Sequence, residues 1–401
     1  MDDQKKSYTS SLISRVIEPG QTTDAAIKEI TNKILDKAAD ARSCYAAIHE
    51  LDDDIRFAEM LLVDGCFILE LLYRWQKKDH PKKGDAILGN TLVFLDVRHD
   101  LLLLENQIPM FVLQTLFAFS LVQTCTLPDM IISFFGNMLN FKLAIRKVNI
   151  TETTAHILGY LHDCYLPCDT ATSEEKDTNQ IIKHSAVDLD RAGVDFKEGK
   201  GGDQICVNFS TSCGFSFLGG TRPRGTSDDI PVFCTYDPTK SRPCCYSWFF
   251  QLCGRTSFEI PKLCIYDSTE PFLRNLIAYE QCSPSIRRHI TSYAFFMDTL
   301  INTKEDVEVL EKAGVVENHL GASEDATRLF NTICKEVVLG EFTFWKQWHD
   351  VEEYCNSEWP RHLASLRRDY FSSPWVLISV IAALILFALT VLQTVYTIRA
   401  G

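Results

Sequence analysis

Residues 57–75 read Phe-Ala-Glu-Met-Leu-Leu-Val-Asp-Gly-Cys-Phe-Ile-Leu-Glu-Leu-Leu-Tyr-Arg-Trp and carry the clearest helical periodicity in the chain. Side chains that recur every three or four residues form one stripe: Phe57, Met60, Leu61, Asp64, Phe67, Ile68, Leu71, Leu72 and Trp75. Every member except Asp64 is apolar, which predicts a helix buried along one face. The pair Asp64-Gly65 departs from this local pattern.

The segments before this stretch divide into a polar start and a second helix. Residues 1–23 are polar and predict a flexible N-terminus. Thr23 or Asp24 is a suitable helix cap, and apolar residues then recur at helical spacing: Ile27, Ile30, Ile34, Leu35 and Ala38.

A second apolar run, residues 100–122, follows a charged connector. It is interrupted by Glu105-Asn106-Gln107 and by Pro109, and both charge and a helix break are costly in lipid. We therefore expect two buried helices joined between Ile108 and Pro109 rather than a membrane span. The polar triplet is either an active-site cluster or a group that satisfies helix ends; the second interpretation is favoured because helix ends leave unpaired amides and carbonyls.

The second half of the chain mixes helical patterns with short β segments. Ser185, Asp188 and Gly193 mark a short capped helix, and residues 194–196, 205–209 and 258–265 have the composition of strands. Later helical stripes are carried by Phe272, Leu273, Leu276 and Ile277, by Ile290, Tyr293, Met297 and Leu300, by Leu329, Phe330 and Ile333, and by Trp345, Trp348 and Val351. Residues 210–256 are rich in Gly, Pro, Ser, Thr and Cys without periodicity, which predicts irregular structure.

The last long apolar stretch, residues 375–398, contains no charged residue. Its roughly 24 residues would span about 36 Å as a helix, enough to cross a hydrocarbon core of about 30 Å. Trp375 and Tyr396 lie where interfacial aromatic residues are expected. Because residues 10–17 do not form the apolar run of a secretory signal, we expect a single-pass tail anchor with the bulk of the chain in the cytosol.

The predicted fold class is mainly α: a large helical globular domain with a small β-hairpin or strand element and one C-terminal transmembrane helix. The predicted regions are a flexible N-terminus (1–23), a helical region (24–168), a polar linker (169–184), a second helical region (185–370) with the β element and an irregular insertion (210–256), and the transmembrane helix (375–398).

Composition and charge exclude some classes of function. The chain has 401 residues and a net charge of −13, and an acidic excess argues against nucleic-acid binding because phosphate contacts need clustered Lys and Arg. Its 15 cysteines are scattered through apolar segments, which favours reduced thiols over a disulfide framework. Asn149 and Asn208 lie in glycosylation sequons. They can be glycosylated only if the domain is lumenal, so their modification tests the topology.

Common catalytic signatures are absent: we find no phosphate-binding glycine loop, dinucleotide fingerprint, serine elbow or paired-histidine zinc helix. His162-Asp163-Cys164 with Cys168 offers only half of a zinc ligand set. The cysteines of the irregular segment, Cys234, Cys244, Cys245 and Cys253, include an adjacent pair that cannot easily ligate one metal. We therefore assign no catalytic, cofactor-binding or metal residue and expect that the protein is not an enzyme.

Five motifs occur in the order in which they occur in a known plant family: Val63-Asp-Gly-Cys-Phe-Ile-Leu-Glu70, Asp100-Leu-Leu-Leu-Leu-Glu-Asn-Gln-Ile-Pro109, Ala192-Gly-Val-Asp-Phe-Lys197, Arg274-Asn-Leu-Ile-Ala-Tyr-Glu-Gln281 and Tyr370-Phe-Ser-Ser-Pro-Trp375. Together they resemble the plant domain-of-unknown-function 247 family. The resemblance implies a largely helical protein with one C-terminal membrane helix and no established catalytic residues. In grasses, members are associated with self-incompatibility, which implies recognition of a partner protein. The segment between Phe209 and Thr256 is an insertion relative to the family pattern. It is either a genuine insertion or intron sequence that has been translated in the gene model.

Two functions from different classes follow. The first is a membrane-anchored interaction or recognition component with an unknown protein partner. The alternative is an unrecognised membrane-tethered enzyme that uses a Cys/His site such as Cys164 and His162.

Overall fold

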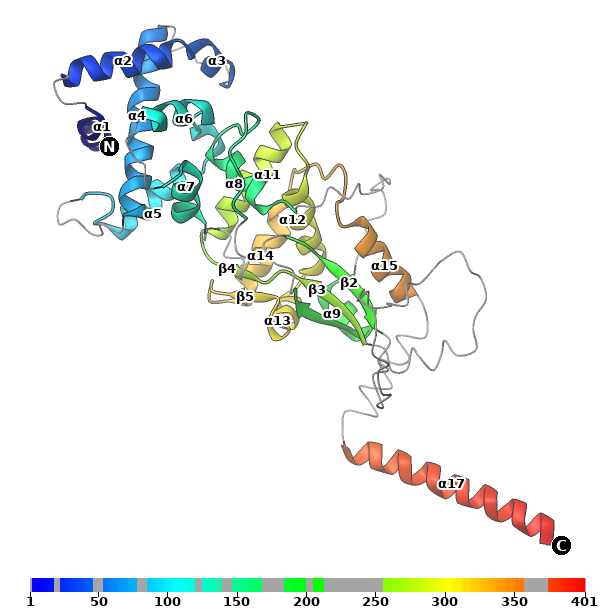
Figure 1. Ribbon diagram of the computed structural model, residues 1–401. Coiled ribbons are helices and arrows are strands. Elements are labelled where there is room, and N and C mark those ends of the chain that lie inside the picture. The colour runs from blue at the N-terminus through cyan, green and yellow to red at the C-terminus, as the bar shows by residue number, and fades with distance from the viewer. Residues whose placement is uncertain are drawn as a thin grey trace, which may run out of the picture.

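The computed structural model describes residues 2–17, 22–45, 53–77, 85–119, 125–136, 138, 146–167, 184–199, 205–212, 255–356 and 374–400 (Figure 1). The described chain is mostly helical with a small mixed sheet, which confirms this part of the predicted fold class. In Figure 1 the N-terminal helices form one end of the molecule, the strands and the helices beside them follow, and the C-terminal helix α17 (Pro374–Ala400) lies at the other end.

The first half of the chain is helical and is organised around α4. Its elements are α1 (Asp2–Val16), α2 (Thr23–Leu35), α3 (Ala38–Ser43), α4 (Asp54–Gln76), α5 (Thr91–Asp100), η1 (Leu104–Asn106), α6 (Met110–Phe119), α7 (Leu127–Phe135) and α8 (Ile157–Tyr165). Helix α4 begins where the Asp53 side chain accepts a hydrogen bond from the Ile55 N–H (3.0 Å). The predicted apolar face is buried against α1, α2, α6 and α7.

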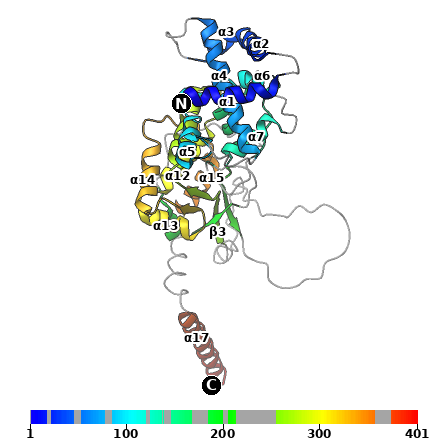
Figure 2. The same ribbon diagram turned by 90° about the vertical axis from the view of Figure 1, so that its left-hand side faces the viewer.

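The N-terminus differs from the flexible segment that its polar composition predicts. Residues 2–16 form helix α1, which packs against α4 (Figure 2). Three apolar side chains of α1 are buried: Tyr8, Leu12 and Ile13. The prediction for residues 1–23 was wrong in this part because so few apolar residues do not reveal a helix until the surface that covers them is known.

The same contacts explain why α4 contains Asp64 and Gly65. Lys5 Nζ lies 2.6 Å from Asp64 Oδ1, so the carboxylate is paired at the edge of the α1–α4 contact. A Cβ atom on Gly65 would lie 2.3 Å from Leu116 Cδ1 of α6. The glycine therefore permits close approach of the two helices.

The break between α5 and α6 is held by Gln107. Its Nε2 donates to the carbonyls of Leu101 (2.9 Å) and Leu103 (2.8 Å), and its Oε1 accepts from the Leu158 N–H (3.2 Å). Helix α6 begins directly after Pro109. The predicted break and the role of Gln107 at helix ends agree with the structure, and α6 begins where predicted. The first helix was placed wrongly: α5 ends at Asp100, and residues 101–109 form a connection that contains η1 instead of a buried helix that reaches Ile108.

The second half contains the strands. Its elements are α9 (Ala186–Arg191), β1 (Val194–Glu198), β2 (Asn208–Ser212), β3 (Arg255–Ile260), β4 (Leu263–Ile265), α11 (Thr269–Cys282), α12 (His289–Leu300), α13 (Lys304–Lys312), β5 (Val316–Asn318), α14 (Ser323–Ile333), α15 (Trp345–Asn356) and α17 (Pro374–Ala400). Helix α9 has the predicted capping box of Ser185 and Asp188, and Gly193 follows it with a φ of 89°.

Two small sheets form from these strands. The first has the order β1-β3-β2, with β1 parallel and β2 antiparallel to β3, and the second is the parallel pair β4-β5. The β1 and β2 segments do not pair as a hairpin, because β3 lies between them. Phe258 of β3 is buried with its ring near those of Phe296 (5.4 Å) and Phe209 (5.6 Å).

One continuous cluster of buried side chains extends from Tyr8 to Cys355 and includes both helical regions. The predicted boundaries between these regions stay predictions. Most of the linker 169–184 and residues 213–254 of the irregular insertion lie outside the described residues, whereas residues 210–212 and 255–256 belong to β2 and β3.

Helix α17 is 27 residues long, and both views place it apart from the other helices (Figures 1 and 2). Among the residues whose side chains the structure describes, no single helix is both long and apolar enough to cross a membrane. Within α17, residues 385–395 form a shorter apolar helical segment. Helix α5 and residues 104–119 are together long and apolar enough, but they are bent by 91° with respect to each other.

Candidate functional site

The most buried polar arrangement in the described chain joins α8, α11 and α12. His162 of α8 and Glu280 of α11 are both inaccessible to solvent, and His162 Nε2 donates to Glu280 Oε1 at 2.7 Å. Two apolar helices bring these residues together, since Leu158 and Leu161 on α8 and Leu276 and Ile277 on α11 are buried around them.

Glu280 also caps the N-terminus of α12. Its Oε1 accepts from the Ile290 N–H (2.9 Å), and its Oε2 accepts from the Thr291 N–H (2.7 Å) and the Thr291 hydroxyl (2.5 Å). A carboxylate at this position satisfies amides that have no partner within the helix and interacts favourably with the helix dipole. The buried charge is thus stabilised by four donors.

The protonation of His162 follows from the same geometry. Burial alone would lower its pKa, but Asp163, whose Oδ1 lies 3.6 Å from Nδ1, and Glu280 together raise it. The positively charged His162 ring donates a hydrogen bond to the Glu280 carboxylate. The Tyr279 ring covers one side of His162, with 5.5 Å between the ring centroids. This arrangement is suited to joining three helices rather than to proton transfer with a substrate.

Cys164, the second residue of the predicted Cys/His pair, has different neighbours. Residues two apart on a helix do not share a face, and Cys164 is buried beside Tyr160, whose hydroxyl donates to the Val148 carbonyl (2.9 Å). Burial raises the pKa of the Cys164 thiol, although hydrogen bonds with the Val148 backbone and Tyr160 oppose this. A protonated, buried thiol is a poor nucleophile. The hydrogen-bond partner of His162 Nε2 is Glu280 and not Cys164. Cys168, Cys234, Cys244, Cys245 and Cys253 lie outside the described residues.

A further buried histidine was not singled out from the sequence. His289 Nε2 donates to the Ile205 carbonyl at 2.8 Å and so ties the start of α12 to the segment before β2. Burial lowers its pKa, which favours the neutral ring. Glu280 was also missed as an individual residue. The sequence signals were its place directly after the apolar stripe of residues 272–279 and within the motif of residues 274–281.

The fold and the buried polar groups thus define a mainly helical protein whose central charges serve packing. A family model described as "Plant protein of unknown function" (DUF247) matches residues 1–389. The chain belongs to this plant family of unknown function, which confirms the resemblance inferred from the five motifs.

Two relatives from Arabidopsis thaliana are similar to the chain over most of its length. The UPF0481 protein At3g47200 is 26% identical over 398 residues, which covers 96% of this chain and 77% of the relative. The putative UPF0481 protein At3g02645 is 23% identical over 443 aligned positions, covering 95% of this chain and 81% of the relative. No solved structure matches the chain significantly.

Proposed function

We propose that this chain is a single-pass membrane protein in which α17 is the anchor and the helical domain recognises a partner protein at the membrane surface. The observation that carries the proposal is the exposure of the α17 side chains. Its described large apolar residues are between 48% and 70% exposed: Ile378, Ile385, Leu386, Phe387, Leu389, Val391, Leu392 and Val395.

Exposure of this kind is unfavourable in water, because each Å² of apolar surface removed from water contributes about 25 cal/mol. Lipid would cover α17 without requiring a protein partner. Residues 375–398 contain no charge, whereas Arg361, Arg367 and Arg368 precede them and Arg399 follows. An excess of positive charge before the span supports a cytosolic domain.

The recognition part of the proposal is supported by the roles of the buried polar groups. Glu280 and Gln107 use their oxygen atoms to bind helix ends, and His162 is held by Glu280. These groups are therefore engaged in the fold rather than directed at a substrate. A link with self-incompatibility, as the family resemblance implies for grasses, would be one form of such recognition.

Charge placed in α17 tests the anchor. In full-length protein expressed in plant cells, we expect the double variant Leu386→Arg with Leu389→Arg to move from the carbonate-resistant membrane fraction to the soluble fraction, since each central arginine costs about 2.5–3.5 kcal/mol on insertion. Leu92→Arg is a matched control, because Leu92 is an exposed leucine of α5. Unchanged membrane retention of the α17 variant would contradict the anchor.

Orientation is measured on the same membranes. We expect protease to digest the domain in intact membranes and expect no glycans at Asn149 or Asn208, both of which are exposed. Modified sequons would place the domain on the other side.

Recognition is tested by proximity labelling from the full chain, with α17 fused to an unrelated domain as the control. We expect a reproducible set of proteins labelled only by the full chain. Identical sets from both proteins would leave anchoring intact and contradict recognition.

The competing hypothesis, an enzyme that uses Cys164, predicts a different result. Cys164→Ser should then abolish the phenotype that depends on the protein, whereas the recognition proposal expects the phenotype to be retained with the variant at normal abundance.

A further inference from the structure

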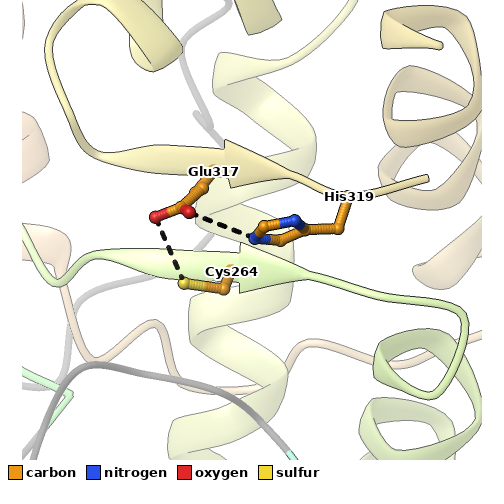
Figure 3. A group of neighbouring side chains, drawn as sticks. All are labelled: Cys264, Glu317 and His319. Atoms are coloured by element: carbon orange, nitrogen blue, oxygen red, sulfur yellow. Dashed lines mark hydrogen bonds and ion pairs between the residues drawn. The ribbon is translucent and has the colours of Figure 1, made fainter. Parts of the chain in front are cut away.

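A cysteine, a glutamate and a histidine meet on the parallel pair β4-β5 (Figure 3). Cys264 is the central residue of β4 and lies in register with Glu317 of β5, and His319 directly follows β5. Cys264 is buried, Glu317 is partly buried and His319 is exposed. The cluster thus extends from the core to the surface, at a position distant in sequence from the His162 region.

The distances between the donor atoms are those of a metal site. Cys264 Sγ lies 3.8 Å from Glu317 Oε2, and His319 Nε2 lies 3.2 Å from Glu317 Oε1. All three donor atoms lie within 4.8 Å of one another. Tetrahedral zinc with bonds of about 2.0–2.3 Å separates its donor atoms by about 3.3–3.8 Å, so little movement is needed to reach this geometry.

The fold orients the three side chains. The His319 N–H donates to the Ile265 carbonyl (2.9 Å), which extends the ladder between the strands by one residue. The Tyr266 ring stacks on the His319 ring with a centroid distance of 4.3 Å and an angle of 8°. In Figure 3 the imidazole points back along the strands towards Glu317, and dashed lines join Glu317 to both His319 and Cys264.

A competing cation is already present, because Lys262 Nζ lies 2.6 Å from Glu317 Oε2. An ion pair alone would account for Glu317, but it would not account for a thiol and an imidazole directed at the same carboxylate. A metal ion bound to Oε1 and His319 would also take the Cys264 thiolate, which now contacts Oε2, and would leave Oε2 to the lysine.

We propose that Cys264, Glu317 and His319 bind a divalent transition-metal ion, with zinc the best fit and the fourth position open to water. Thiolate and imidazole ligands suit zinc, whereas Mg²⁺ and Ca²⁺ prefer oxygen donors. Binding forms a bond between Sγ and the metal, and the thiol proton is released to solvent. The inference concerns the β4-β5 surface and is independent of the membrane anchor.

Metal binding is tested on the full-length protein in detergent, reduced and stripped with a chelator. We expect Co²⁺ to give a thiolate-to-metal charge-transfer band with a stoichiometry of about one and to release one thiol proton on binding. We expect Zn²⁺ to displace Co²⁺ and abolish the band without further proton release. Cys264→Ser should remove the band. His319→Gln changes an exposed side chain and should weaken Zn²⁺ binding by at least about 10-fold.

Three controls separate this site from adventitious binding. His349→Gln removes a histidine that also lies near a glutamate, Glu352, at 4.0 Å. Cys282→Ser removes an exposed thiol, and both variants should bind Zn²⁺ as the unmodified protein does. Lys262→Gln removes the competing ammonium and should bind Zn²⁺ more tightly.

The proposal is overturned if Co²⁺ gives no charge-transfer band or if Cys264→Ser and His319→Gln, each with an unchanged circular-dichroism spectrum, bind Zn²⁺ as well as the unmodified protein. If Cys264→Ser fails to fold, the other two variants decide the question. Weaker Zn²⁺ binding by His319→Gln and tighter binding by Lys262→Gln support the site. Unchanged binding by both variants contradicts it.

Discussion

Helices α4 and α17 are both long and rich in apolar residues, yet their environments are opposite. Helix α4 has 23 residues and is buried among neighbouring helices, whereas α17 has 27 residues and its described apolar side chains are exposed. Helix α4 contains Asp64, Glu70 and Arg74, and residues 375–398 of α17 contain no charge. The comparison shows that apolar length does not distinguish a buried helix from an exposed one, whereas charges that require protein partners do.

The charges of α4 form a network with two other segments. Glu70 is buried and accepts from Arg74 Nε (2.6 Å), and the Arg15 guanidinium of α1 lies against its second oxygen. Arg74 Nη1 also lies 2.7 Å from Asp85 Oδ2, and the Tyr8 hydroxyl donates to Asp85 Oδ1 (2.7 Å). The network joins α1, α4 and the turn before α5.

A matched pair of phenylalanines gives the sharpest test of the comparison. Phe67 of α4 is 4% exposed and Phe387 of α17 is 70% exposed. Phe67→Ala should lower the free energy of unfolding of the domain by about 3–5 kcal/mol, whereas Phe387→Ala should change it by less than about 0.5 kcal/mol. Urea unfolding of the full chain in detergent, followed by tryptophan fluorescence, measures both. Similar losses in the two variants would show that α17 packs on the domain.

Loss of the buried charge in α4 should have the next largest effect. Glu70→Gln keeps the size of the side chain but removes the carboxylate that Arg15 and Arg74 share, so that Arg74 keeps only the Asp85 carboxylate. We expect a loss of about 3 kcal/mol in the free energy of unfolding. The exposed Glu105→Gln is the control. The double variant Glu70→Gln with Arg15→Met should recover part of the loss, because Arg74 keeps Asp85; no recovery would mean that the unpaired Arg15 is not the source of the loss.

Close packing in α4 predicts a smaller loss. Gly65→Val should destabilise the domain by about 1–3 kcal/mol through overpacking against Leu116. Combining it with Leu116→Ala should cost less than the sum of the two single changes, because the shortened leucine makes room for the new side chain. Additive losses would indicate that Gly65 is needed for its backbone and not for space.

The smallest expected effect is a dependence on pH. Burial alone would raise the pKa of Asp85, but hydrogen bonds from Tyr8, Leu88, Arg74 and Ile87 lower it overall. Since the folded pKa is below the unfolded value of about 3.9, the stabilisation is complete above that pH and is lost as the pH falls through the folded value. Tyr8→Phe should remove about 1 kcal/mol near neutral pH and less in acid. Urea unfolding across this range tests it, and a loss independent of pH would contradict the coupling.

The sequence predicted those elements in which neighbouring residues carry the information. The stripe of α4, the Pro109 start of α6, the Ser185 capping box and the three β segments follow from spacing and cap residues, and the five motifs identified the family. Helix α1 was missed because it is stabilised by contacts with α4 rather than by its own composition. The order of the strands was not predicted, because the pairing of β3 with both β1 and β2 joins segments that are distant in sequence.

The functional groups divide in the same way. Residue types and spacing determined the apolar character of residues 375–398 and the lack of a complete ligand set within any single segment. Only the tertiary structure brought Glu280 to His162 across 118 positions and Cys264 to Glu317 across 53. The physical reason is that a paired charge or a metal site depends on distances of a few Å between side chains, and folding sets those distances through packing that sequence spacing does not record.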